Sequence, residues 1–351
     1  MRQTSSKLML LAAIAVLTFA PSVLAQSGTA ALAALPEADA LIYVSPQRIL
    51  NEAAPRVMAP ADLAKMRATF SDLKKGAGVD PATLEYLVIA VRFHKPANDL
   101  SFVAPDVMAV VGGDFSADSF ITLGQLYLQD KVRVEKYGSK SISVGTVDPI
   151  AAAAAKNPIL KPYVEIGAVA LSANSFAIGN LGYIKAAVDA ADGTRRINPA
   201  TIESLMRDPN VLIAASGAPL AAFAKSIGLL GLETTARESR CDTNFGNFYA
   251  AVTMTGTNFS LRGAINADNP DTAKIINNLL SGLMKQGAGA VPDKNAQTIL
   301  QTLKMTARDS EIVIEADIPE KMVADFIRTP PAAKTEAKPA SRRPVRRKRT
   351  R

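Results

Sequence analysis

The chain of 351 residues contains no tryptophan, a single cysteine (Cys241) and a single histidine (His94). One cysteine excludes a disulfide within the chain, and a protein of this length can build a core without one. Zinc sites normally draw on several histidine and cysteine ligands, so a zinc centre is not expected. Beyond the N-terminus, no uncharged apolar run approaches the ~20 residues that a transmembrane helix needs. We expect no metal, no other cofactor and no transmembrane helix in the mature chain.

Positive charge is concentrated at one end of the sequence. The chain has 40 basic and 32 acidic residues, a net charge of +8. The segment 330–351 alone holds nine basic residues and one acid, Glu336, which makes +8. The segment 26–329 holds 29 basic and 31 acidic residues, a net charge of −2. The tail 329–351 has four prolines and almost no apolar bulk, so we expect it to be disordered.

The N-terminus has the three zones of an export signal. A basic start with Arg2 and Lys7 precedes an apolar run over 8–20, and Val23 and Ala25 are small residues at the positions before a signal-peptidase cut. An apolar run of about 13 residues is too short to span a bilayer. We predict cleavage after Ala25 and a periplasmic or secreted mature protein.

The body after the signal peptide (1–25) and a lead-in segment (26–37) divides into two halves, 38–205 and 206–328. Each half shows the same predicted order of strand, helix, paired strands, helix, hairpin and helix, and the first half carries an extra unit at 164–191. This pattern predicts an α+β fold with antiparallel sheets, helices packed on one face, and a possible internal duplication. Separate sheets and one continuous sheet both fit it. Strands are expected at 40–44, 84–93, 106–111, 132–136, 141–147, 164–171, 175–179, 211–215, 247–254, 258–265, 303–307 and 311–316.

Helix starts are indicated by capping residues followed by proline or by apolar periodicity. Ser45-Pro46 predicts a helix that Pro55 and Pro60 interrupt. Further helices are expected over 61–75, 117–129 and 183–191, after Asp148-Pro149, Ser216–Pro219 and Asn269-Pro270, and from Pro319 to Ile327.

Few residues suggest catalysis or ligand binding. His94 would have to be the base of any Ser-His-Asp triad, but Ser216 lacks the nucleophile-elbow motif, so we expect a solvated or hydrogen-bonded histidine at a strand end. The Gly112–Asp114 turn lacks the spacing of a phosphate-binding loop and predicts a tight strand-to-helix turn. The segment Asp268–Asp271 predicts a helix cap rather than a calcium loop.

The most polar internal segment is 237–247, which we interpret as a connecting loop and as the first candidate for a binding surface. Arg240 would lower the pKa of the adjacent Cys241 thiol, and Asp242 would oppose that effect. The thiol could be idle, reactive or paired between chains. The candidate binding residues are Arg237, Arg240, Cys241, Asp242 and Asn244.

The basic tail is the second candidate surface. In an exported protein its natural partners are anionic membranes or wall polymers, and nucleic acid is not expected. A solubilising tail without a fixed partner is the alternative. The candidate residues are Arg342, Arg343, Arg346, Arg347, Lys348, Arg349 and Arg351.

The run Leu35–Val44, followed by a helix and later hairpin–helix units, resembles an uncharacterised family of exported bacterial proteins. The resemblance spans 35–328 and implies an envelope or secreted protein without assigned activity. From residues and resemblance together we expect a non-catalytic binding or scaffolding protein of the periplasm or envelope, with the tail as an electrostatic tether. An exported hydrolase that uses carboxylates or a serine is the rival hypothesis.

Overall fold

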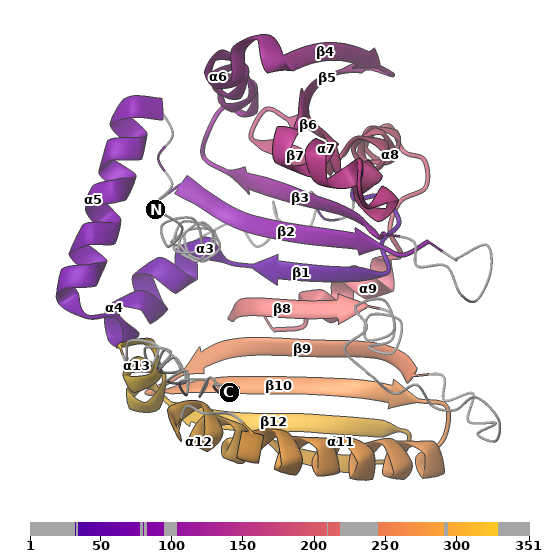
Figure 1. Cartoon of the computed structure of the whole chain (residues 1–351). Coiled ribbons are helices and arrows are strands. Elements are labelled where there is room, and N and C mark those ends of the chain that lie inside the picture. The colour runs from indigo at the N-terminus through magenta and orange to yellow at the C-terminus, as the bar shows by residue number, and fades with distance from the viewer. Residues whose placement is uncertain are drawn as a thin grey trace, which may run out of the picture.

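A single large antiparallel sheet organises the protein. The computed structural model describes residues 32, 34–77, 80, 83–94, 104–208, 210–217, 245–290 and 294–328. Across these residues, twelve strands lie in the order β11-β12-β10-β9-β8-β1-β2-β3-β7-β6-β5-β4 (Figure 1). Every neighbouring pair is antiparallel. The predicted α+β class is therefore confirmed, and the sheet is continuous across both halves.

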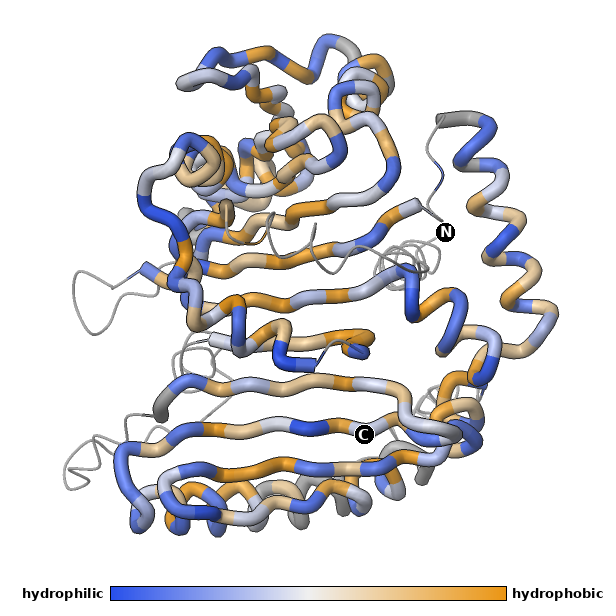
Figure 2. The backbone as a smooth tube through the Cα atoms, turned by 180° about the vertical axis from the view of Figure 1, so that it is seen from behind, coloured by the Kyte–Doolittle hydropathy of each residue, from blue (hydrophilic) through white to orange (hydrophobic). Residues whose placement is uncertain are grey.

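The strands begin and end within a few residues of their predicted positions, because alternating apolar residues and turn residues mark them locally. Figure 2 shows the strands as largely apolar segments between hydrophilic turns. Their bounds are β1 Ala40–Val44, β2 Leu84–Arg92, β3 Asp106–Gly113, β4 Val132–Tyr137, β5 Lys140–Thr146, β6 Glu165–Ser172, β7 Ser175–Asn180, β8 Val211–Gly217, β9 Phe245–Thr255, β10 Asn258–Ala267, β11 Lys304–Arg308 and β12 Glu311–Pro319.

Helices fill most connections between the strands. Two of them, α9 and α12, were not predicted, although Asn198 caps α9 by accepting a hydrogen bond from the Ala200 amide. The predicted helix after Ser216–Pro219 falls outside the described residues. The bounds are α3 Pro46–Arg48, α4 Ala54–Val57, α5 Pro60–Ala77, α6 Ala117–Leu128, α7 Asp148–Ala154, α8 Leu181–Ala191, α9 Pro199–Leu205, α11 Pro270–Ala290, α12 Lys294–Thr302 and α13 Glu320–Arg328.

Pro55 does not break the helix after β1, contrary to the prediction. The chain stays helical from α3 through a π-helical turn, Ile49–Ala53, into α4. Proline lacks an amide hydrogen and its ring collides with the carbonyl four residues earlier, and a wider π turn is one way to relieve that conflict. Only Pro60 separates two helices, α4 and α5.

The two halves meet at the β1–β8 pair in the middle of the sheet. Outward from this pair the first half places β2, β3, β7 and β6, and the second half places β9, β10, β12 and β11. The hairpin β6–β7 therefore occupies the position that β11–β12 holds in the other half. In this strand order the hairpin β4–β5 has no counterpart in the second half, and the internal duplication stays a prediction.

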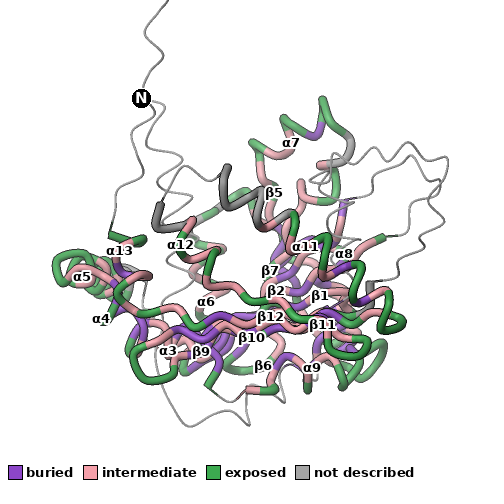
Figure 3. Tube along the Cα trace, turned by 90° about the horizontal axis from the view of Figure 1, so that it is seen from below, coloured by how far each residue is buried: buried purple, intermediate pink, exposed green. Residues whose placement is uncertain are grey.

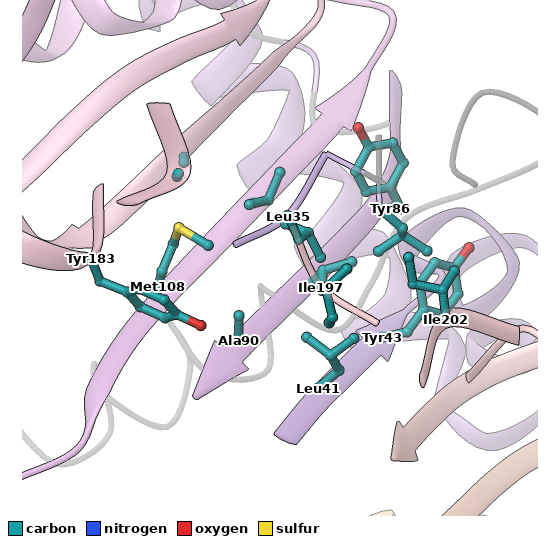
Figure 4. Close-up of a cluster of buried hydrophobic side chains, with 14 of the residues drawn as sticks. Leu35, Leu41, Tyr43, Tyr86, Ala90, Met108, Tyr183, Ile197 and Ile202 are labelled. Atoms are coloured by element: carbon teal, nitrogen blue, oxygen red, sulfur yellow. The ribbon is translucent and has the colours of Figure 1, made fainter. Parts of the chain in front are cut away.

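Helices cover both faces of the sheet rather than the one face predicted. The helices α8 and α9 pack on one face, where Met108, Tyr183 and Leu205 join the largest core cluster; Figure 4 shows Met108 and Tyr183 of this cluster. Figure 3 shows that buried segments are concentrated in the strands, whereas exposed segments lie around them. On the other face Phe120 of α6 stacks on Phe176 of β7 with ring centroids 4.5 Å apart, and α11 packs on β10 and β12. Both faces can take helices because the strands carry apolar residues at odd and even positions alike.

Candidate functional site

Polar side chains gather where β2 ends and β3 begins. Asp106 is buried, and its Oδ2 atom accepts hydrogen bonds from Arg92 Nη2 at 2.6 Å and Nε at 3.2 Å. The His94 Nε2 atom lies 3.0 Å from the same oxygen. The Arg92 guanidinium also lies 4.7 Å from the ring centroid of Tyr183. His94 therefore lies at a strand end beside a carboxylate, as expected for a residue held there by polar contacts.

The cluster is better suited to holding the fold together than to catalysis. The Tyr183 hydroxyl donates to the Glu37 carbonyl, and burial raises the pKa of this phenol, an effect that nearby Arg92 partly offsets. No serine within the described part of the chain is hydrogen-bonded to His94, and the carboxylate it faces is shared with Arg92. A triad base needs a nucleophile within hydrogen-bond reach. This geometry gives no support to the hydrolase hypothesis.

An apolar cavity lies between α6 and the strands β5, β6 and β7. Its volume is about 440 Å³. Phe120 and Phe176 line it, and their rings form an aromatic cluster with Phe115 in which centroids are 4.5 to 6.2 Å apart. The lining residues are Phe120, Ile121, Gly124, Gln125, Leu128, Lys131, Val132, Ser143, Gly145, Thr146, Val147, Asp148, Pro149, Ile166, Ala168, Phe176 and Ile178.

Most polar side chains of this cavity are paired with one another. Gln125 donates a hydrogen bond of 2.7 Å to the Ser143 hydroxyl. Lys131 and Asp148 form an exposed ion pair at the rim, with Nζ and Oδ2 2.5 Å apart. A ligand in the cavity therefore meets mainly carbon, with charge available at one end only. Sequence patterns did not indicate this site, because its residues come from two helices, α6 and α7, and several strands, and none is unusual by type.

A second cavity, of about 580 Å³, lies on the opposite face beside the end of α9. It mixes cations with acids, and Arg262 is paired with Asp317 at 3.1 Å. Burial raises the pKa of its Tyr249, an effect that Asp208 reinforces and Arg207 opposes. This mixed charge selects no single ligand class. Its polar lining residues are Arg207, Asp208, Tyr249, Arg262, Arg308 and Glu311.

The two surfaces singled out by sequence fall outside the described residues. This applies to the loop residues Arg237, Arg240, Cys241, Asp242 and Asn244, and to the basic tail 329–351. The Gly112–Asp114 turn and the cap before α11 are described, and both agree with prediction. The helix α6 starts directly after that turn, and the Asn269 side chain accepts a hydrogen bond from the Thr272 amide.

The part of the chain that the structure describes contains neither a metal-ligand cluster nor a membrane-spanning helix. No group of three or more histidine, cysteine, aspartate and glutamate side chains is arranged to hold a metal ion. None of the described helices combines the length and apolar character needed to cross a bilayer.

Comparison with known proteins does not identify a family. No family model and no curated protein matches the chain. Three solved structures of TP0453 are similar at a low level. Crystal form III has a TM-score of 0.44 and 9% identity, covering 84% of this chain and 96% of that one. Crystal forms I and IV have TM-scores of 0.42 and 0.43, each with 10% identity. A likeness this distant supports no conclusion about function.

Proposed function

We propose that this chain is an exported, envelope-associated binding protein that holds an apolar small molecule between α6 and the sheet and catalyses no reaction. The cavity under α6 carries this proposal. Its volume of about 440 Å³ lies within the ~300–1,000 Å³ of ordinary ligand pockets, and its apolar lining with a few polar groups is also typical of them. Burial of apolar ligand surface there would supply the binding free energy.

The test compares two helical glycines that both have room for a side chain, of which only one lines the cavity. Gly124 lies in the middle of α6 and lines the cavity, whereas Gly182 lies in the first turn of α8, away from it. A Cβ atom at either position would meet no other atom within 4 Å. Both helices should therefore accept Gly→Phe, and only Gly124→Phe should place a ring in the cavity.

Binding is measured with N-phenyl-1-naphthylamine, whose fluorescence rises in an apolar environment. We expect the unmodified protein to bind it saturably, Gly124→Phe to bind it at least about tenfold more weakly, and Gly182→Phe to match the unmodified protein. Thermal melts establish that both variants fold. Binding that does not saturate, or that survives Gly124→Phe unchanged, would refute the cavity as the binding site.

The proposals of export and of an electrostatic tether rest on the amino-acid sequence. The signal-like segment 1–25 supports cleavage after Ala25, and the charge of the tail 329–351 supports attraction to an anionic membrane or wall polymer. Mass spectrometry of the protein recovered from the periplasm or medium should find Gln26 as its first residue. An intact N-terminus on that material would contradict export by cleavage.

The tail is tested by deleting residues 330–351. We expect thermal stability to be unchanged and salt-sensitive binding to anionic vesicles to be lost, because the remaining chain carries no net positive charge to attract them. Vesicles of neutral lipid serve as the control. Equal binding of anionic vesicles by both forms would contradict the tether.

A further inference from the structure

An apolar strip crosses the middle of the sheet on the same face as the cavity. We define it by Ile178, Ala109, Ile89 and Ile42, which lie on the neighbouring strands β7, β3, β2 and β1. Each is directly opposite the next in the strand register. Ile178 is 40% exposed and Ile42 38%, while Ala109 and Ile89 are half-buried.

The other face of the same strands is fully covered. Met108 and Val88 have 0% exposure beneath α8 and the segment around Leu35, as Figure 4 shows for Met108, Leu35 and their neighbours. In an antiparallel sheet a face left open to water normally carries polar residues. Rows of apolar residues flank the strip on both sides. These flanking residues are Ala40, Val91 and Val107 on one side and Val44, Leu87, Val111 and Phe176 on the other.

The strip continues directly from the cavity. In the strand register Ser143 of β5 is opposite Ala168 of β6, and Ala168 is opposite Ile178 of β7. These three residues line the cavity. One straight line of side chains therefore runs from beneath α6 across β5, β6 and β7 onto the strip, perpendicular to the strands. The exposed Lys131–Asp148 pair also lines the cavity, beside the end of β5.

The chemistry of the strip selects an occupant without polar groups. Its strands each pair with neighbours on both sides, so an added peptide strand would find no free ladder of hydrogen bonds. No charged side chain belongs to the strip or its flanking rows. At about 4.8 Å per strand, the three steps from Ile178 to Ile42 span about 14 Å, which suits a long narrow ligand better than a compact ring system.

We infer that the protein binds an unbranched long-chain acyl amphiphile such as a fatty acid. Its polar head stays in water at the Lys131–Asp148 rim, the first part of its chain fills the cavity, and the remainder lies on the apolar strip. This inference rests on the proposed function, because the cavity holds the first part of the chain.

The test is the dependence of affinity on chain length. Octanoate, decanoate, dodecanoate, tetradecanoate and hexadecanoate are used to displace N-phenyl-1-naphthylamine from the full-length protein, at high salt and below their micelle concentrations. Each buried methylene should strengthen binding about fourfold, and the gain should continue to hexadecanoate.

Substitutions on the strip separate its contribution from that of the cavity. The double variant Ile42→Thr/Ile89→Thr keeps β-branched residues in the strands but adds hydroxyls to the strip. We expect it to bind hexadecanoate about tenfold more weakly and octanoate unchanged. Ile275→Thr, at an apolar residue of α11 that is 60% exposed, is the matched control and should change neither affinity.

The outcomes distinguish the inference from the proposed function. Affinity that stops rising at dodecanoate in the unmodified protein, or a double variant with unchanged hexadecanoate binding, would overturn the strip and leave the cavity as the site. A dimer by light scattering that the double variant converts to monomer would assign the strip to a second copy of the chain. If no fatty acid of any chain length displaces the probe, the inference of an acyl ligand is refuted.

Discussion

Replacing Gly179 by alanine tests the packing that holds the strip and the cavity in register. Gly179 of β7 is opposite Met108 of β3. A Cβ atom there would lie 2.4 Å from the Val107 carbonyl oxygen and 2.7 Å from the Met108 Cα atom. These distances are about 1 Å shorter than ordinary contacts of about 3.5 Å between carbon atoms. Both contacted atoms belong to the backbone, so a side-chain rotation cannot relieve the clash.

The expected loss of stability follows from the separation of the two strands that this clash requires. Moving β3 and β7 about 1 Å apart would stretch the nearest ladder hydrogen bonds beyond their normal range of ~2.7–3.2 Å. Each such bond contributes about 1 kcal/mol net, and overpacking a core typically costs about 1–3 kcal/mol. We therefore expect Gly179→Ala to lower the free energy of unfolding by about 2–4 kcal/mol.

Urea unfolding followed by circular dichroism measures this change, and Gly182→Ala is the control. Gly182 has open space around it and lies in a helix, so alanine there should stabilise the protein by about 0.5–1 kcal/mol. Substitutions at unconstrained surface sites usually change the free energy of unfolding by no more than about 0.5 kcal/mol. A Gly179→Ala variant within that range of the unmodified protein would show that β3 and β7 do not approach this closely.

Three further predictions concern titration, the polar cluster and a helix cap. Burial raises the pKa of Tyr86 to about 12 in the folded protein, against about 10 when unfolded, so the stability its neutral phenol provides is complete below about pH 10 and is lost towards pH 12. Between about pH 10 and pH 12 the urea unfolding midpoint should fall less for Tyr86→Phe than for the unmodified protein, and an equal fall would contradict the assignment of this pH dependence to Tyr86. Asp106→Asn should cost about 1–3 kcal/mol in urea unfolding because it leaves Arg92 without its carboxylate, while Asp62→Asn on the exposed face of α5 should cost under about 0.5. Similar costs for both would refute a structural role of the cluster. Asn198→Ala should cost about 1 kcal/mol through loss of the α9 cap, and an unchanged urea midpoint would show that the cap contributes nothing.

Local sequence signals predicted most of the elements. The cap at Asn269 forms as expected, and the helix expected over 117–129 begins after Ser116, whose side chain accepts a hydrogen bond from the Ser119 amide. The hairpin β4–β5 turns at Gly138, whose φ of +53° favours glycine. These features succeed because their physical cause lies within a few residues of the chain. Two local signals did not act as expected: a π-helical turn accommodates Pro55, and the Ser45 side chain makes no capping hydrogen bond at the start of α3.

The order of the strands and the exposure of each face depended on contacts between distant residues. The burial of Met108 and the exposure of Ile178 follow from which helix packs on which face, and both strands are apolar at odd and even positions. The pairing of Asp106 with Arg92 and His94 likewise needs β2 and β3 side by side.

The amino-acid sequence by itself determined the apolar periodicity, the helix caps, the near-neutral body and the basic tail, because each is a property of composition or of neighbouring residues. Only the tertiary structure decided that Ser143, Ala168, Ile178, Ala109, Ile89 and Ile42 form one line. These residues come from six strands, and backbone hydrogen bonding between the strands sets the register that aligns them.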